Sequence, residues 1–353
     1  MPHPRVAVLI LGFNHRATLE ACIDSVLKQS RTPDLIRYID NASTDDSVVF
    51  VQQQFPAISV QINKLNIGYA GGYKNALAEV FQQDFDAAIL LNPDTLVDAR
   101  WFETLVTAAF ADDTVALAQP KIYLYDAVNQ TKTNHINTFG NHIHFLGFGY
   151  CGRYNELDEP PIVTNQSIVD ASGACLLVKK SHYQQLAGLD ESFFAYLEDQ
   201  DLNWQVQEQG FKILCVADSL AWHQYDFEKK NLANSLKFYL LERNRLTFLL
   251  KHFETKTLLL IAPAFCVMEC GMLVDALLRG YFRAKLKSYW DFLKYIPHTL
   301  QSRKIIQDKR TQSDRELFAF LSPTIEFEAV DSPLLRLANR FLKWYYRCIK
   351  RWI

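Results

Sequence analysis

Short apolar runs alternate with amphipathic segments over the first third of the chain, and this alternation constrains the fold more than any other feature. Residues 5–11, RVAVLIL, form a continuous aliphatic and β-branched run, and residues 35–39 and 86–91 form two more. Residues 16–29 carry apolar side chains at helical spacing. Such runs are typical of strands buried on both faces. Their alternation with helices predicts an α/β fold with a doubly wound, mostly parallel sheet.

Polar clusters follow three of the expected strands. They are residues 12–16, 40–45 (DNASTD) and 92–94 (NPD). In doubly wound sheets, ligands bind at the carboxyl ends of the strands. Asp40 has the chemistry to accept a hydrogen bond from a nucleobase imino group, although the Ser and Thr beside it also suit a helix cap. Asp94 is a candidate ligand for a hard cation, although Asn-Pro-Asp is also common in turns.

Two further segments carry candidate chemistry. The glycine-rich residues 66–75 are expected at the start of a helix. Such a loop can bind a phosphate or a sugar, but it is also typical of an ordinary turn between a strand and a helix. Glu198, Asp199 and Asp201 lie within four residues, after an aromatic segment. Neighbouring like charges raise a carboxyl pKa and favour a general base, although acids are also common in the first turn of a helix.

The order of these motifs resembles that of the family 2 glycosyltransferases of GT-A fold, and most closely their bacterial rhamnosyltransferase-type branch. The resemblance covers about residues 5–245. It rests on Phe13-Asn14, residues 40–45, Asn66-x-Gly68, Asn92-Pro93-Asp94, the segment GLDESFFAYLEDQDL at 188–202, and Trp222-His223. It implies a sugar transferase that uses a nucleoside-diphosphate sugar, with a thymidine or uridine donor favoured.

The resemblance also implies roles for individual residues. Asp40 would bind the base of the nucleotide, Asp199 would be the catalytic base, and Asp94 would hold Mg²⁺ or Mn²⁺ with His223 as a second ligand. Glu198 and Asp201 would orient the acceptor or the backbone. The remaining residues implied to lie against the nucleotide and sugar are Phe13, Asn14, Arg16, Asn41, Asn66, Gly68, Asn75 and Asn92.

One position departs from the wider family. The usual metal motif has two acids two residues apart, whereas this chain has Asn92 in place of the first and keeps only Asp94. A single carboxylate base with no second carboxyl nucleophile fits inversion by one displacement, in which the acceptor hydroxyl attacks the anomeric carbon opposite the leaving diphosphate.

The C-terminal part differs in charge and hydropathy from the rest. Residues 1–278 carry a net charge of -11 and residues 279–353 one of +9, and the acidic main part argues against nucleic acid as a partner. Residues 334–353 place six Arg and Lys on one helical stripe opposite an aromatic, apolar face. This predicts a helix that lies on an anionic membrane surface, or one docked on its own protein. In residues 258–278, Glu269 and Asp275 favour an in-plane or re-entrant helix over one that crosses a membrane.

We therefore expect a GT-A catalytic domain at 1–230 and a helical, membrane-associating region at 231–353. Residues 129–167 carry scattered glycines and prolines and predict a long mobile loop. Seven cysteines without a CxxC pair fit a reduced chain at the cytosolic face of the cell membrane, where the acceptor would be a glycan or a lipid-linked sugar. A sugar nucleotidyltransferase and a non-catalytic nucleotide-sugar-binding scaffold are the alternatives.

Overall fold

The computed structural model describes residues 3–225 and 235–353. A mixed sheet forms its centre, with the strand order β10-β12-β6-β11-β4-β1-β2-β3. The strands of this path are β1 (Val6–Gly12), β2 (Leu35–Asp40), β3 (Ser59–Ile62), β4 (Ala87–Leu91), β6 (Val115–Asp126), β10 (Gln166–Ile168), β11 (Cys175–Lys179) and β12 (Lys212–His223). The predicted mostly parallel α/β sheet is confirmed, because β3, β2, β1 and β4 are mutually parallel and β12 is parallel to β6.

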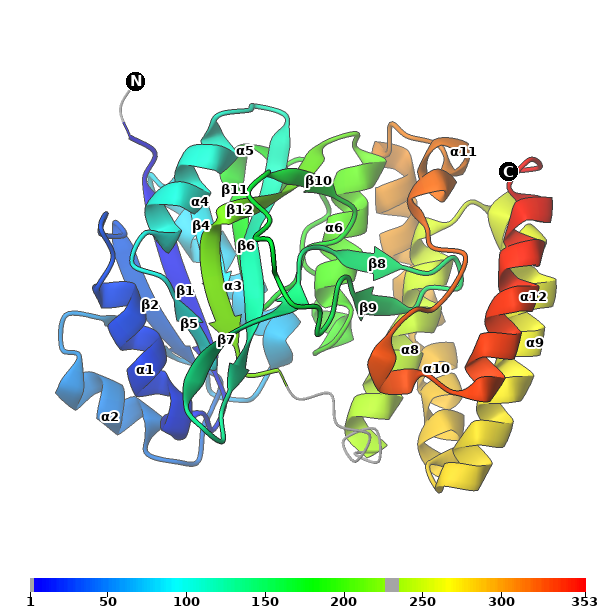
Figure 1. Ribbon diagram of the computed structural model, residues 1–353, viewed down its shortest axis with the longest axis horizontal. Helices are drawn as coiled ribbons and strands as arrows, with labels where there is room; N and C mark the ends of the chain where they lie inside the picture. Colours follow the sequence, from blue (N-terminus) through cyan, green and yellow to red (C-terminus); the bar gives the residue numbers. More distant parts are fainter. Residues whose placement is uncertain (1–2, 226–234) are drawn as a thin grey trace.

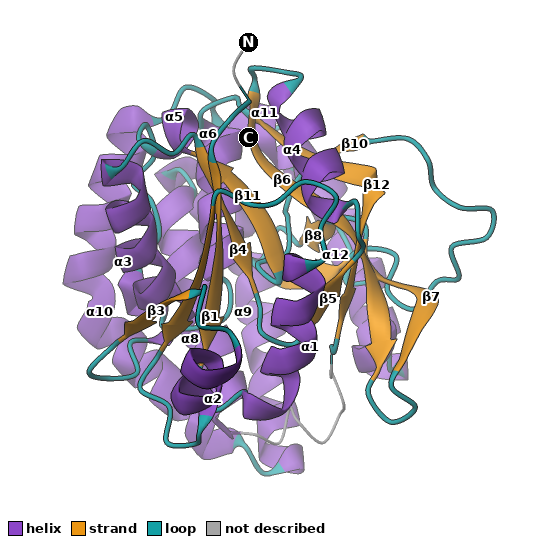
Figure 2. Cartoon of the chain, turned by 90° about the vertical axis from the view of Figure 1, so that its left-hand side faces the viewer, coloured by secondary structure: helices purple, strands orange, loops and turns teal. Residues whose placement is uncertain are grey.

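Helices cover both faces of this sheet (Figure 2). The cluster with α1 (Arg16–Leu27), α2 (Ser47–Gln54) and α4 (Trp101–Phe110) packs on one face, and α3 (Gly68–Gln82) with α6 (Glu198–Glu208) packs on the other. Successive side chains of β1 alternate between the two clusters. Every residue of β1 is buried, as its continuous apolar run requires.

Two predictions in the middle of the chain are wrong. Residues 129–167 contain β7 (Thr131–Thr138), β8 (Asn141–Ile143), β9 (Gly149–Cys151) and the start of β10, so they are not a structureless loop. Residues 168–179, IVDASGACLLVK, have a pattern that predicts one strand, but the structure breaks this segment into β10 and β11. A loop that contains Asp170 lies between them. β11 then pairs antiparallel with both β4 and β6, which makes the sheet mixed at its centre.

Long helices form the C-terminal part and stand together at the end of the molecule opposite α1 and α2 (Figure 1). They are α8 (Ser235–His252), α9 (Thr255–Arg279), α10 (Phe282–Lys309) and α12 (Pro333–Ile349), with the short α11 (Asp314–Leu317) before the last. Residues 232–252 have a helical apolar pattern and form a helix from Ser235 onward, and residues 232–234 lie outside the described part. α10 lies within the region expected to be helical, although its own bounds were not predicted.

These helices are docked on the catalytic part. A third apolar cluster joins Trp204 of α6 to Phe248 of α8, Ile261 of α9 and Tyr346 of α12. The Tyr345 hydroxyl donates to the Leu260 carbonyl at 2.8 Å, which ties α12 to α9. α12 is therefore docked on its own protein through one face, while the six basic side chains of residues 334–353, four of them on α12, remain exposed.

α9 is long and apolar enough to cross a membrane by length and composition. However, Glu269 near its middle is buried in an ion-pair network with Arg245 of α8 and Lys285 of α10. The Lys285 ammonium lies 2.7 Å from the Glu269 carboxylate. These partners lie on charged helices packed beside α9, so its carboxylate is compensated inside the protein.

Candidate active site

Several residues that are expected to bind the nucleotide lie at the carboxyl ends of β1, β2 and β4. Gly12 pairs with Asp40 in the β1–β2 register, and Asn41 N–H donates to the Gly12 carbonyl at 2.8 Å. Asp40 is almost fully buried, and its carboxylate accepts bonds from the Tyr38 hydroxyl at 3.1 Å and the Ser43 N–H at 2.9 Å. Asp40 is thus fixed in one orientation at a strand end.

Asn41 and Asn66 hold the neighbouring loops together. The Asn41 amide donates to the Asn66 side chain at 2.9 Å and to the Gly68 carbonyl at 3.0 Å, and its oxygen accepts from the Ile67 N–H at 3.2 Å. Both amides are engaged inside the protein, so their direct contact with a nucleotide stays a prediction.

Gly68 has a reason to be glycine that the sequence did not reveal. Its φ is +74°, and a Cβ at this position would lie 2.2 Å from the Phe194 carbonyl oxygen. The Ala70 N–H donates to that same carbonyl at 3.1 Å. Gly68 therefore lets the start of α3 contact the turn that precedes Glu198 and Asp199.

Of the other residues expected to bind the nucleotide, some lie beside Asp40 and some point away from it. Phe13 is half-exposed at the end of β1, and the Asn14 side chain accepts from the Thr44 N–H at 2.7 Å, so both lie beside Asp40. Arg16 is turned toward α2, where its guanidinium stacks on the Phe50 ring at 3.3 Å from the centroid. Asn75 is exposed on α3 and does not line the cavity described below.

Asp94 and His223 form a pair, as expected for two ligands of one cation. β5 (Thr95–Val97) pairs with β12 so that Thr95 lies opposite His223, which brings the His223 Nε2 within 3.3 Å of the Asp94 carboxylate. Burial raises the pKa of Asp94, but the His223 charge more than offsets this and the pKa lies below its usual value.

The pair fits a divalent cation. His223 Nδ1 lies 3.1 Å from the Asn137 side-chain oxygen, which leaves Nε2 directed toward Asp94. The Asp94 Oδ1 atom is buried, and its contact with His223 Nε2 at 3.3 Å lacks the geometry of a hydrogen bond. The described residues include no cluster of three or more His, Cys, Asp or Glu side chains able to hold a metal, so the substrate and water would complete the coordination.

A cavity of about 990 Å³ opens beside this pair. Asn92 and His223 line one end, and Asp170, Glu198 and Asp199 line the same space. The three carboxyl groups come from two elements, since Asp170 lies between β10 and β11 while Glu198 and Asp199 begin α6. His223 of the Asp94–His223 pair and a cluster of acids thus line one cavity.

Asp199 is the acid of the cluster whose geometry best suits a base. Its Oδ2 accepts from the Gly173 N–H at 2.9 Å and its Oδ1 from the Gln200 N–H at 2.8 Å, while its side chain remains partly accessible. Burial raises its pKa, and the two N–H donors offset part of that rise. A raised pKa and a fixed orientation are what a general base needs.

Asp170 and Glu198 are held more strongly in the protonated form. Burial and then the Asp199 charge raise the pKa of each well above its usual value. Asp170 accepts a bond from the Asn203 amide at 2.6 Å, whereas Glu198 Oε2 is buried without a hydrogen-bond partner. Asp170 was missed, although an acid that interrupts an apolar run, followed by Ser172-Gly173, was an available signal.

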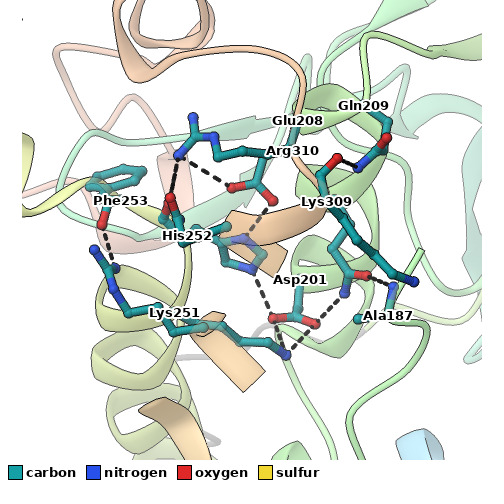
Figure 3. Close-up of polar contacts among 12 residues, drawn as sticks. Ala187, Asp201, Glu208, Gln209, Lys251, His252, Phe253, Lys309 and Arg310 are labelled. Atoms are coloured by element: carbon teal, nitrogen blue, oxygen red, sulfur yellow. Dashed lines mark hydrogen bonds and ion pairs between the residues drawn. The ribbon is translucent and has the colours of Figure 1, made fainter. Parts of the chain in front are cut away.

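Asp201 does not belong to the cavity, which corrects its expected role at the acceptor. It is fully buried on the opposite side of α6, where it contacts Lys251 and His252 at 2.9 Å each (Figure 3). His252 also contacts Glu208 at 3.0 Å. Helix geometry explains the difference, because Asp199 and Asp201 are two positions apart on α6 and residues at that spacing point in different directions.

Arg243 and Asn244 on α8 support the site, although the sequence assigns them no role. The Asn244 amide donates to the carbonyls of Phe193, Ala195 and Tyr196 at 2.7–3.0 Å. The Arg243 guanidinium donates to the Phe193 carbonyl at 2.9 Å. These bonds hold a turn in which Phe194, Tyr196 and Leu197 all have positive φ, a conformation that needs external support.

Comparisons with known proteins place this site in a class. A crystal structure of GalNAc-T7 with UDP, GalNAc and Mn²⁺ matches with a TM-score of 0.52 at 14% identity, covering 70% of this chain and 51% of that one. The fold is therefore that of the GT-A glycosyltransferases.

The sequence comparisons narrow the class to a family. The model of the glycosyltransferase-like family 2 matches residues 3–247, and the chain belongs to this family. An N-acetylglucosaminyl-diphospho-decaprenol L-rhamnosyltransferase of Mycobacterium tuberculosis is 24% identical over 233 residues, which are 61% of this chain and 75% of that protein. The O-antigen biosynthesis protein RfbC of Myxococcus xanthus is 22% identical over 232 residues, 62% of this chain and 17% of that protein. The expected rhamnosyltransferase-like branch is thus confirmed.

Proposed function

We propose that this glycosyltransferase moves a sugar, with inversion, from a nucleoside-diphosphate donor of the dTDP-rhamnose or UDP-sugar class to a hydroxyl of a glycan or lipid-linked acceptor in cell-surface polysaccharide synthesis. The observation that carries the proposal is the cavity whose lining contains both Asp199 and His223, the side chain that contacts Asp94 at 3.3 Å. The name of the mycobacterial relative supports rhamnose as the sugar and a lipid-linked acceptor, and the name of RfbC supports a role in polysaccharide synthesis.

In this proposal, Asp199 Oδ takes the proton of the acceptor hydroxyl as that oxygen attacks the anomeric carbon. The N–H groups of Gly173 and Gln200 orient the carboxylate before and after it accepts the proton. Glu198 and Asp170 remain protonated beside it and donate hydrogen bonds to acceptor oxygens. No second carboxylate is required as a nucleophile, which is the reason for proposing inversion.

Asp40 binds the nucleobase and, with Phe13 and Asn14 beside it, forms the donor end of the site. Asp94 and His223 hold Mg²⁺ or Mn²⁺, which supplies charge neutralisation for the leaving diphosphate when bound. Asn92 lines the cavity beside His223 and lies next to the donor sugar.

We propose that the C-terminal helices hold this site at a membrane. Residues 1–230 form the catalytic domain and 231–353 a helical region whose exposed basic stripe on α12 binds the anionic cytosolic face of the cell membrane. Each Lys or Arg near such a surface contributes about 1 kcal/mol, so six of them would hold the protein there together with the exposed apolar side chains. We also propose that α9 lies in the plane of the surface.

The first test is donor turnover. Purified protein is mixed with Mn²⁺ or Mg²⁺, a panel of UDP-, dTDP- and GDP-sugars and a lipid extract as acceptor source, and the released nucleoside diphosphate is measured. We expect metal-dependent release from one donor. Asp199→Asn should lower turnover by about 10²–10⁴-fold and leave donor binding intact, since it removes the base alone.

The control is Asp40→Asn, which changes the donor end instead. It should raise the KM for the donor with less effect on kcat, because a hydrogen bond to a charged group contributes roughly 1.5–3 kcal/mol. Turnover that survives in Asp199→Asn would reject the assignment of the base. Donor binding without turnover under any condition would favour a non-catalytic scaffold.

A further inference from the structure

The cavity that contains Asp199 continues well beyond the carboxylates, into a trough between α9 and α12. We infer that this trough holds the hydrocarbon chain of the acceptor lipid, and that the acceptor reaches Asp199 from the membrane side. This inference rests on the proposed function, because it concerns the acceptor of the same reaction. It assigns a chain-binding site to residues of the C-terminal helices.

The lining of the cavity changes from polar to apolar along its length. Asp170, Glu198, Asp199 and His223 line the sheet end. Most of the lining from α9 and α12 is apolar, namely Val267, Met268, Met272, Leu334, Leu337 and Phe341. Asp275 and Arg279 at the C-terminal end of α9 also line the cavity and pair with each other at 2.8 Å. A space of about 990 Å³ lies at the upper end of the range for small-molecule sites. The gradient fits an amphiphile with its sugar at Asp199 and its chain between the two helices.

The far end of the cavity reaches the surface through exposed apolar side chains. Leu334 and Leu337 are more than 60% exposed, and Val267 is 58% exposed. Arg336 and Arg340 are exposed on the same helix. The mouth of the trough thus combines apolar side chains with cations, the combination that lies against an anionic bilayer. A lipid in such a bilayer can enter the trough without its chain crossing water.

The trough has fixed walls, so it is a built site and not a gap between loose helices. α9 is attached through Glu269, which pairs with Lys285 at 2.7 Å and with Arg245 of α8. α12 is attached through buried Leu342 and Ile349. The two walls therefore remain in place when no lipid is bound.

Gly271 offers a way to block the trough alone. It lines the cavity, and a Cβ added there meets no atom within 4 Å. A larger side chain can therefore leave the helix here without a clash at Cβ, and the indole of a tryptophan would occupy the trough. Any residue other than Pro also favours the helix over Gly. Cys270 is exposed on the same helix and does not line the cavity, so Cys270→Trp adds similar bulk outside the trough.

The experiment measures binding of farnesyl β-D-glucoside by isothermal titration to the wild-type chain and to the two tryptophan variants. Methyl β-D-glucoside serves as the control for the sugar group without a chain. Each methylene excluded from an apolar site weakens binding by roughly fourfold. We therefore expect Gly271→Trp to weaken farnesyl glucoside binding at least about tenfold, with wild type and Cys270→Trp alike and the methyl glucoside much weaker than both.

Three results would overturn the inference. The first is equal affinity of the two tryptophan variants for farnesyl glucoside, and the second is equal affinity of the wild-type chain for the methyl and farnesyl glucosides. The third is complete displacement of farnesyl glucoside by dispersed phosphatidylglycerol at equal concentration, because that result would assign the trough to bulk membrane lipid. Binding of the donor nucleotide should be the same in all three proteins, which verifies folding. Failure of the donor-turnover test with normal chain binding would reject the proposed function alone.

Discussion

The two sides of α6 contain the same residue types and behave in opposite ways. Asp199, on the cavity side with Glu198, has no cationic side chain bonded to it, and burial raises its pKa. Asp201, on the far side, contacts both Lys251 and His252 (Figure 3). The ion pairs of Asp201 stabilise the docking of α8 on α6. Asp199 has no such pair among the described residues, and its raised pKa suits it to accept a proton.

This contrast teaches how the C-terminal region takes part in the site. α8 supplies Lys251 to the buried network and Asn244 to the turn before Asp199. One helix therefore fixes α6 from behind and supports the strained turn at its start. The acids of the cavity can remain uncompensated because the neighbouring structure is fixed by other contacts.

The largest expected effect is a loss of stability when the ion pairs of Asp201, on the side of α6 that faces away from the cavity, are broken. Lys251→Met removes the cation between Asp190 and Asp201 and leaves two buried carboxylates without it. Loss of one partner of a buried ion pair costs about 3–5 kcal/mol, so the free energy of unfolding in urea should fall by that amount. Lys287→Met is the matched control, because Lys287 pairs with Asp291 at the exposed surface and should change stability by less than about 1 kcal/mol. Similar losses in both would refute the contrast.

The next effect concerns the turn that α8 supports. Asn244→Ala removes the donors to the carbonyls around Ala195, and the turn with positive φ values should relax and shift Asp199. A small displacement of a catalytic group lowers rate by about 10²-fold, so kcat should fall while the donor KM stays the same. Asn165→Ala, which loses a similar bond to the Ala217 N–H elsewhere, should keep the wild-type kcat. A change in KM alone would argue for donor binding instead.

How far the sequence could predict these features depends on the range of the interactions that determine them. The strands and helices up to residue 91 follow from local apolar spacing, and Asp94 and Asp199 follow from their motifs. β7 could not be predicted, since its sequence TKTNHINT has no apolar alternation and its conformation depends on pairing with β6. Asp201 was misassigned because its partner Lys251 is fifty residues away, and no local pattern shows which side of α6 meets α8.

A smaller expected effect is a change in stability when the charge of Asp199 is removed, which tests whether a nearby cation compensates that charge. Burial raises the pKa of Asp199 because the folded protein disfavours its charged form. The ionised carboxylate therefore lowers the free energy of unfolding at pH values above this pKa. The loss disappears as the pH falls and the carboxyl group is protonated. Asp199→Asn should therefore raise stability near neutral pH by about 1 kcal/mol, as is common at functional sites, and the gain should disappear in acid. Chemical unfolding across a pH series measures this. A loss of stability at neutral pH would show that the carboxylate is compensated after all.

The smallest expected effect separates Asp199 from Asp170. A base must be ionised, so the rate should fall as the pH is lowered, and the acid limb should lie above the usual range of an aspartate because burial raises the pKa of Asp199. Burial and the Asp199 charge keep Asp170 protonated, so Asp170→Asn exchanges one neutral group for another. The pH dependence of kcat should then show the same acid limb in this variant. A limb that moves to lower pH would instead mean that the two carboxyls share the ionisation, and the pair would have to be treated as one base.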